Sequence, residues 1–131
     1  MDYYIADFMK NQGIDISKEQ LIVLKYLHQE DGRIQNDLAF ITNRSKTALT
    51  RLINTMEKKG LLYRSVSAKD MRINHIFLSK LGRDTWEKSH PLILQIEKNL
   101  LQGISGDQLL IVQNVMKQIQ QNINLKTIIN Q

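Results

Sequence analysis

Side chains suited to catalysis or metal binding are few and scattered in this chain of 131 residues. The histidines His28, His75 and His90 lie far apart, without the spacing of a helical metal site, and there is no glycine-rich phosphate loop or nucleophile elbow. The absence of cysteine excludes disulfides, thiolate metal sites and thiol nucleophiles. We therefore expect no enzyme, no catalytic residue, no metal and no cofactor, and we interpret His75 as a structural residue.

The chemistry that the sequence favours is hydrogen bonding to the edges of DNA bases. In the segment 45–59, four apolar residues fall at positions i, i+3, i+4 and i+7, which predicts one buried helix face: Leu49, Leu52, Ile53 and Met56. At about 100° per residue, five polar residues fall on or beside the opposite face: Thr47, Thr50, Arg51, Asn54 and Lys58. Arginine pairs with guanine, asparagine with adenine, and the threonine methyl contacts thymine. Arg51 is the strongest single candidate for reading a base.

Three residues at the start of this helix are suited to a phosphate. Arg44, Ser45 and Lys46 lie where backbone N–H groups and the helix dipole favour an anion. We expect them to position the protein on DNA without reading its sequence. An ordinary exposed helix face with incidental charge is the alternative interpretation.

A second group of charged residues lies on a predicted β-hairpin. The stretches 62–66 and 73–78 are rich in β-branched and aromatic residues, and a polar segment separates them. Lys69 and Arg72 at its tip could reach an adjacent minor groove. We expect Arg64, in the first strand, and Asp70 to belong to the DNA-binding surface of the wing as well. We hypothesise that Asp70 pairs with Arg72 or Arg64 and fixes the shape of this wing. The alternative is a solvated turn with weak surface ion pairs.

The distribution of charge agrees with these two groups. The net charge is −3 in residues 1–40, +7 in residues 41–90 and +1 in residues 91–131. A basic block of this kind suits a nucleic-acid backbone, although a solvated basic face would look the same. Aromatic residues make up only 6% of the chain, which favours duplex DNA over single strands.

The flanking sequence predicts the elements that hold these residues. Ser17 and Gln20 form a capping-box pattern before a helix that Asp31-Gly32 ends, and a short helix is expected over 35–41. Gly60 occupies the position of a left-handed cap after the basic helix. A long helix is expected from Ser79 to about residue 102, kinked or restarted at Pro91, and a last helix from Ser105 or Asp107 almost to the C-terminus.

Five sequence segments, in this order, are similar to the signature of MarR-type transcriptional regulators. They are Ile16-Ser17-x-x-Gln20-x-x-Val23-Leu24-x-x-Leu27, Asp37-Leu38-Ala39, Leu49-Thr50-Arg51-Leu52-Ile53-x-x-Met56-Glu57-Lys58-Lys59-Gly60-Leu61-x-x-Arg64, Asp70-x-Arg72 and Leu78-Ser79-x-x-Gly82. The resemblance implies a mostly α fold with a small β-hairpin, a winged helix-turn-helix with N- and C-terminal dimerisation helices. It also implies that a small aromatic effector could bind between the dimerisation helices and the winged domain.

Domain organisation and partners follow from these observations. We expect residues 1–15 to contribute to dimerisation, residues 16–82 to bind DNA and residues 83–131 to dimerise. Ile5, Phe8 and Met9 and the stripe from Leu109 to Ile123 lie outside the winged-helix core and need an apolar partner, which a homodimer supplies. A monomer with its ends packed together is the alternative.

The sequence therefore predicts a homodimeric regulator, a repressor of transcription that binds a pseudo-palindromic operator in double-stranded DNA. No apolar run is long enough to span a membrane, so we expect a cytoplasmic protein. A winged-helix module that binds a protein and a nonspecific DNA-binding protein are the alternatives.

Overall fold

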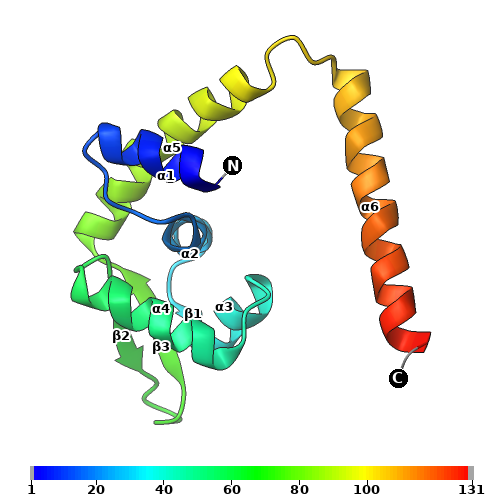
Figure 1. Cartoon of the computed structure of the whole chain (residues 1–131). Coiled ribbons are helices and arrows are strands. Elements are labelled where there is room, and N and C mark those ends of the chain that lie inside the picture. The colour runs from blue at the N-terminus through cyan, green and yellow to red at the C-terminus, as the bar shows by residue number, and fades with distance from the viewer. Residues whose placement is uncertain (1, 130–131) are drawn as a thin grey trace. The chain divides into compact units, whose positions relative to one another are not determined.

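The computed structural model describes residues 2–129 of the chain, with side chains for residues 7–124. It contains six α-helices and three β-strands among these residues (Figure 1). They are α1 (Asp2–Asn11), α2 (Lys18–Gln29), β1 (Arg33–Ile34), α3 (Gln35–Ile41), α4 (Lys46–Lys58), β2 (Leu62–Val66), β3 (Asn74–Leu78), α5 (Lys80–Leu100) and α6 (Gly106–Ile129). The chain divides into two compact units, residues 1–96 and residues 97–131.

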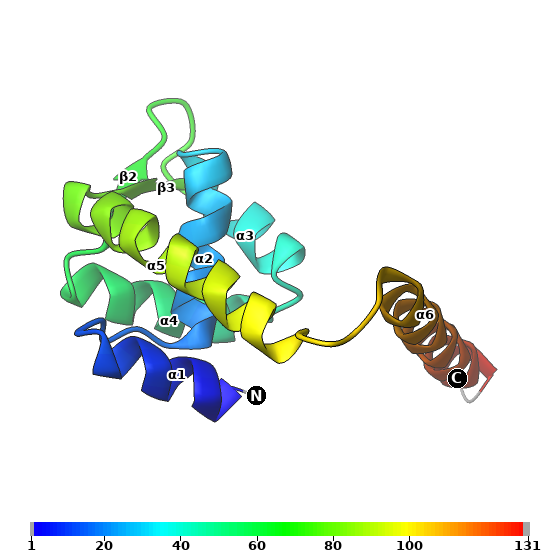
Figure 2. The ribbon, with the colours of Figure 1, turned by 90° about the horizontal axis from the view of Figure 1, so that it is seen from above.

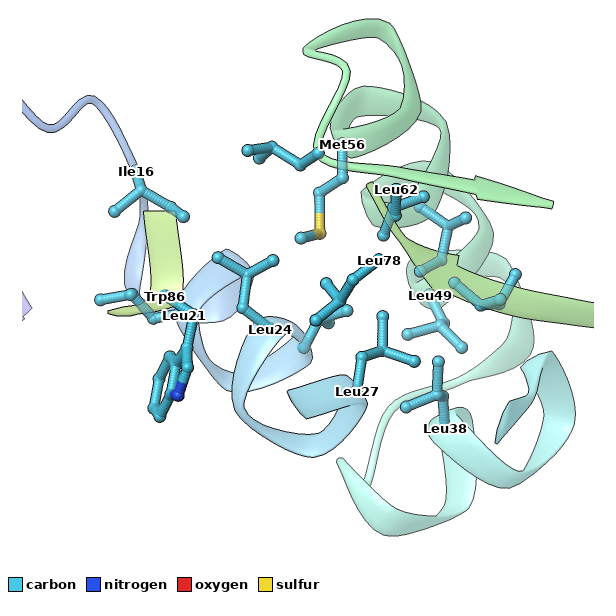
Figure 3. Close-up of a cluster of buried hydrophobic side chains, with 14 of the residues drawn as sticks. Ile16, Leu21, Leu24, Leu27, Leu38, Leu49, Met56, Leu62, Leu78 and Trp86 are labelled. Carbon is cyan, nitrogen blue, oxygen red and sulfur yellow. The ribbon is translucent and has the colours of Figure 1, made fainter. Parts of the chain in front are cut away.

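The first unit is built around α2, which lies between α1 and α4 in Figure 1. Its core combines side chains from the helices and from strands β2 and β3, several of which meet in Figure 3. Members with almost no exposed surface are Val23, Leu24, Leu27, Leu38, Leu49, Ile53, Met56 and Ile76. The core therefore fixes α4 against α2, α3 and the sheet, with one face of α4 left toward solvent.

Helix boundaries follow the predicted caps. Ser17 and Gln20 form both hydrogen bonds of a capping box at the start of α2. Ser45 caps α4 by accepting a hydrogen bond from the Ala48 N–H, and Gly60 after α4 has a φ of 76°. Glycine takes this left-handed conformation without the steric cost that a Cβ would bring. The prediction of the basic helix and its two ends is confirmed.

The wing is larger than the predicted hairpin. Strands β2 and β3 pair antiparallel, and β1 pairs with the other edge of β3, so the sheet has three strands in the order β1-β3-β2. β1 has only two residues, Arg33 and Ile34, which is too short for an alternating pattern to appear in the sequence. In Figures 1 and 2 the β2–β3 turn projects from the unit on the side away from α1.

Two expectations about the flanking helices need correction. Met9 of α1 has no exposed surface and belongs to the core of the first unit, so its burial needs no second protein chain. Phe8 is half-buried, and the side chain of Ile5 lies outside the described residues. α5 is one helix through Pro91, so the helix does not restart there, and the alternative of a kink at Pro91 stays a prediction. Trp86 before the proline and Ile96 after it are both buried, and this packing outweighs the one backbone hydrogen bond that proline removes.

Helix α6 begins at Gly106, close to the expected start, and Ser105 caps it by accepting a hydrogen bond from the Gln108 N–H. The Gln108 side chain accepts one from the Ser105 N–H, which completes a second capping box. Apolar side chains of α6 remain open to solvent: Leu110, Ile111, Val112, Val115, Met116 and Ile119.

Candidate nucleic-acid interface

The exposed face of α4 carries the polar residues that the periodicity predicted there. Thr47, Arg51, Asn54 and Lys58 are exposed and Thr50 is half-buried, whereas Leu49, Ile53 and Met56 on the opposite face are buried. One surface of a helix therefore presents a guanidinium, an amide, an ammonium group and two hydroxyls. These groups match the hydrogen-bonding edges of bases in a major groove, which is wide enough to admit a helix.

Basic side chains at both ends of α4 are available to phosphates. Lys46 follows the N-cap Ser45, Lys58 lies in the last turn, and both are exposed. Among the side chains of residues 7–124, none of Lys46, Arg51 and Lys58 makes an ion pair. Arg44, just before the cap, is half-buried, and its backbone N–H donates to the Ala39 carbonyl. The Ser45 hydroxyl accepts the capping hydrogen bond from the Ala48 N–H, and its own hydrogen can still be donated to an anion.

Arg64 lies at the base of the wing and is engaged within the protein. Its Nη1 donates to Glu57 Oε1 at 2.9 Å and its Nη2 to Asn54 Oδ1 at 2.6 Å. Its backbone N–H donates to the other Glu57 oxygen at 3.2 Å. One carboxylate thus holds both the backbone and the side chain of Arg64, which ties β2 to the last turns of α4.

The same network reaches α3 through Gln35. Arg64 Nε donates to Gln35 Oε1 at 3.2 Å, and Gln35 Nε2 donates to Thr50 Oγ1 at 3.1 Å. Thr50 in turn donates its hydroxyl hydrogen to the Lys46 carbonyl at 2.8 Å. We call the five side chains of Gln35, Thr50, Asn54, Glu57 and Arg64 the polar clamp. It connects α3, α4 and β2 on the side of the unit that carries the candidate interface.

The wing tip is shaped by Asp70 and Arg72. Arg72 donates from its backbone N–H and from Nε to Asp70 Oδ1, both at 3.0 Å, and from Nη2 to Asp70 Oδ2 at 3.2 Å. Asp70 therefore pairs with Arg72, not with Arg64, of the two partners considered. The Arg72 side chain nevertheless stays 89% exposed, so it is held in place and still open to a ligand. The Arg72 side chain and then its backbone lower the pKa of Asp70 below the ordinary value of 3.8.

The Ser67 hydroxyl completes the turn. It accepts hydrogen bonds from the backbone N–H groups of Lys69 and Asp70 at 3.2 and 3.3 Å. Lys69 is exposed at this tip. The predicted wing residues thus fall into two places, with Lys69, Asp70 and Arg72 at the tip and Arg64 at the base.

Three polar residues that organise the site were not among the predicted residues. Gln35 and Glu57 belong to the polar clamp, and Ser67 holds the wing turn. Glu57 lies three residues after Asn54 on the exposed side of α4, so helical spacing offered a signal for it. Gln35 is 29 residues from Arg64 in the sequence, and no local pattern relates the two.

The histidines have no shared site. His75 Nδ1 lies 2.9 Å from the Gly32 carbonyl, which agrees with its interpretation as a structural residue, and the rings of His28 and His90 each contact Trp86. In the part of the chain that the structure describes, no three acidic or histidine side chains are grouped to hold a metal ion. None of the described helices is both long and apolar enough to cross a membrane.

Comparison with known proteins agrees with this geometry. The model of the family described as MarR family matches residues 13–73. An uncharacterised HTH-type transcriptional regulator of Bacillus subtilis, YdgJ, is 29% identical over 109 residues, which cover 83% of this chain and 66% of YdgJ. The matched stretch therefore spans slightly under two thirds of that relative.

Solved structures share the fold. MepR of S. aureus, crystallised as a complex with DNA, is 26% identical and superimposes with a TM-score of 0.85 over 94% of this chain and 89% of MepR. A mutant MarR from E. coli, crystallised with operator DNA, is 20% identical, with a TM-score of 0.81 over 90% of this chain and 84% of that chain. At that identity the second likeness concerns the fold alone.

Proposed function

Because this chain belongs to the MarR family of winged helix-turn-helix transcriptional regulators, we propose that it binds operator DNA as a homodimer and thereby regulates transcription. Helix α4 enters the major groove, and the wing tip contacts the adjacent minor groove. We assign sequence reading to Thr47, Thr50, Arg51 and Asn54. We assign phosphate contacts to Arg44, Lys46, Lys58 and Lys69.

The observation that carries the proposal is the exposed face of α4. It presents Arg51 between Thr47 and Asn54 over a helix whose other side is anchored in the core. A rigid helix with a polar, basic outer face is what direct reading of a major groove requires. MepR, to which the chain is 26% identical, was crystallised with DNA, and this supports the same ligand here.

Dimerisation is supported by α6. In the described part of this helix, seven large apolar side chains are at least 47% exposed, and a monomer leaves such a surface in water. A twofold dimer would bury it and would present two copies of α4 to successive turns of a pseudo-palindromic duplex, about 34 Å apart.

We also propose that the protein is a cytoplasmic repressor released by a small aromatic molecule. A cleft of about 370 Å³ in the first unit offers a place for one. Apolar side chains, among them Ile14, Ile16 and Leu61, line it together with Asp15, Lys59 and Lys88. Lys59 already donates to the Asp15 carbonyl and to Gln20 Oε1, so Lys88 is the lysine that would pair with an aromatic anion. Adding benzoate to the protein–DNA complex should lower the affinity for DNA. Unchanged affinity at millimolar benzoate would contradict release by this class of molecule.

Fluorescence anisotropy with the duplex upstream of the gene tests the proposal. We expect tight binding that a scrambled duplex does not compete away, with a steep loss of affinity as salt rises. Equal competition by the scrambled duplex would indicate a nonspecific DNA-binding protein. Binding to neither duplex, at any salt concentration, would favour a winged-helix module that binds a protein.

A further inference from the structure

Asn54 lies on the face of α4 that would meet DNA, yet its amide oxygen is already bound by Arg64. We propose that Arg64 is a positioning residue that fixes the Asn54 amide, so that Asn54 meets a base as a hydrogen-bond donor. The proposal rests on the proposed function and concerns which base that function selects.

The orientation of the Asn54 amide follows from the chemistry of its partner. A guanidinium has five N–H donors and no acceptor, so the Asn54 atom 2.6 Å from Arg64 Nη2 must be the oxygen. The amide nitrogen, with its two hydrogens, is then the free end of this exposed side chain. The positive charge of Arg64 also draws electrons from the amide, which strengthens its N–H donors.

Arg64 itself is poorly placed to bind a phosphate. Its side chain is only 20% exposed, and its Nε, Nη1 and Nη2 all donate within the polar clamp. Glu57 Oε1, 2.9 Å away, balances its charge. This differs from the expectation that Arg64 contacts DNA directly, because its charge and three of its five side-chain N–H donors already have partners inside the protein.

If Asn54 meets DNA only as a hydrogen-bond donor, the base that it is expected to bind changes. Pairing with adenine through two bonds requires the amide oxygen to accept from N6 while the nitrogen donates to N7. The oxygen keeps a second lone pair, but its 2.6 Å bond to Arg64 turns that end of the amide toward the protein. Asn54 then offers its nitrogen to acceptors on the major-groove edge, which are purine N7, guanine O6 and thymine O4. Arg64 therefore acts on specificity through Asn54, without touching a base.

The test compares Arg64→Met, Asn54→Ala and the double variant in the full-length protein, against duplexes that carry each base at each operator position. We expect Asn54→Ala to abolish the preference at one base pair. Arg64→Met frees the oxygen and should shift the preference at that same pair toward adenine by about tenfold. The double variant should behave as Asn54→Ala alone. Arg64→Lys keeps the positive charge but lacks the planar guanidinium with its fixed set of N–H donors. We expect it to shift the base preference as Arg64→Met does.

Lys46→Met is the matched control, because it removes one exposed positive charge near the same surface. It should weaken binding to all sequences evenly and lower the salt slope by about one. Arg64→Met with this same pattern, and with an unchanged base preference, would overturn the proposal and make Arg64 a phosphate contact.

Two further measurements keep the test decisive. Asn54→Asp should keep its hydrogen bond to Arg64 and lose both amide N–H donors. We expect a melting midpoint that is unchanged or higher, together with loss of the base preference. A lower melting midpoint would overturn the contact between residue 54 and Arg64. The midpoints of the single and double variants without DNA should be non-additive, and additive midpoints would also overturn it. A wild-type protein without any sequence preference would instead overturn the proposed function.

Discussion

At the scale of single residues, substitution of Arg51 tests DNA recognition without changing the stability of the fold. Its side chain is exposed on α4 and makes no ion pair among the described side chains, so its loss leaves the core unchanged. Arg51→Ala should weaken operator binding by about 1–3 kcal/mol and relax the preference at one base pair, with an unchanged melting midpoint. Anisotropy and thermal unfolding measure the two effects. Lys98→Ala, which removes one exposed positive charge from α5, is the control and should leave base preference intact.

Asp70 provides a second residue-scale prediction, through its pKa. Hydrogen bonds from the Arg72 side chain and backbone lower that pKa below 3.8. A carboxyl group whose folded pKa is depressed contributes stability above its unfolded pKa and loses it as pH falls through the folded pKa. The wing should therefore keep this pair throughout the range above about pH 4 and lose it only in stronger acid. The carboxyl chemical shift of Asp70 should titrate below 3.8, and in Arg72→Met its midpoint should rise toward that value. An equal midpoint in the two proteins would contradict the pairing.

Residue types and helical spacing were enough to predict which side chains face outward on α4, because the buried stripe of Leu49, Ile53 and Met56 fixes its orientation. They were not enough to predict what Asn54 and Arg64 do. Both residues are of a type that contacts DNA, but only Asn54 is exposed, and their mutual hydrogen bond depends on how β2 packs against α4. That packing is a tertiary feature, which has no periodic signature in the sequence.

At the scale of elements, the close approach of α5 to the segment between α4 and β2 depends on Gly82. A Cβ at this position would lie 1.9 Å from the Leu61 carbonyl oxygen, which is backbone and cannot move aside cheaply. Gly82→Ala should therefore lower the free energy of unfolding by roughly 2 kcal/mol or more, although alanine is intrinsically the better helix former. Urea unfolding measures the loss. Gly106→Ala in α6 is the control, because nothing lies within 4 Å of its added Cβ, and it should be neutral or slightly stabilising.

The elements themselves were predictable where a cap or a stripe marks them. The short helix α3 has the predicted bounds, and the serine caps of α2 and α4 lie where the sequence placed them. Two features escaped prediction because they are set by packing. The two-residue strand β1 exists only through its pairing with β3, and α5 crosses Pro91 because buried residues on both sides hold it.

At the scale of the whole molecule, we expect the apolar surface of α6 to determine the oligomeric state in solution. Val112 and Met116 are 57% and 62% exposed and lie one turn apart, so a negative charge there would oppose burial against a second copy. Val112→Glu and Met116→Glu should convert a dimer into a species of 15.3 kDa in sedimentation equilibrium. Affinity for a full operator should fall when the dimer dissociates, because a monomer binds with only one copy of α4.

Gln121→Glu is the matched control for that experiment. Gln121 is exposed on the same helix, close to the side opposite Val112 and Met116, so the variant adds the same charge away from these two side chains. We expect this variant to stay dimeric and to bind as the wild type does. A wild-type protein that sediments at 15.3 kDa at micromolar concentration would contradict the dimer. If Gln121→Glu dissociates as readily as Met116→Glu, the interface lies elsewhere. Loss of the dimer would then depend on the added negative charge and not on its position on the apolar face.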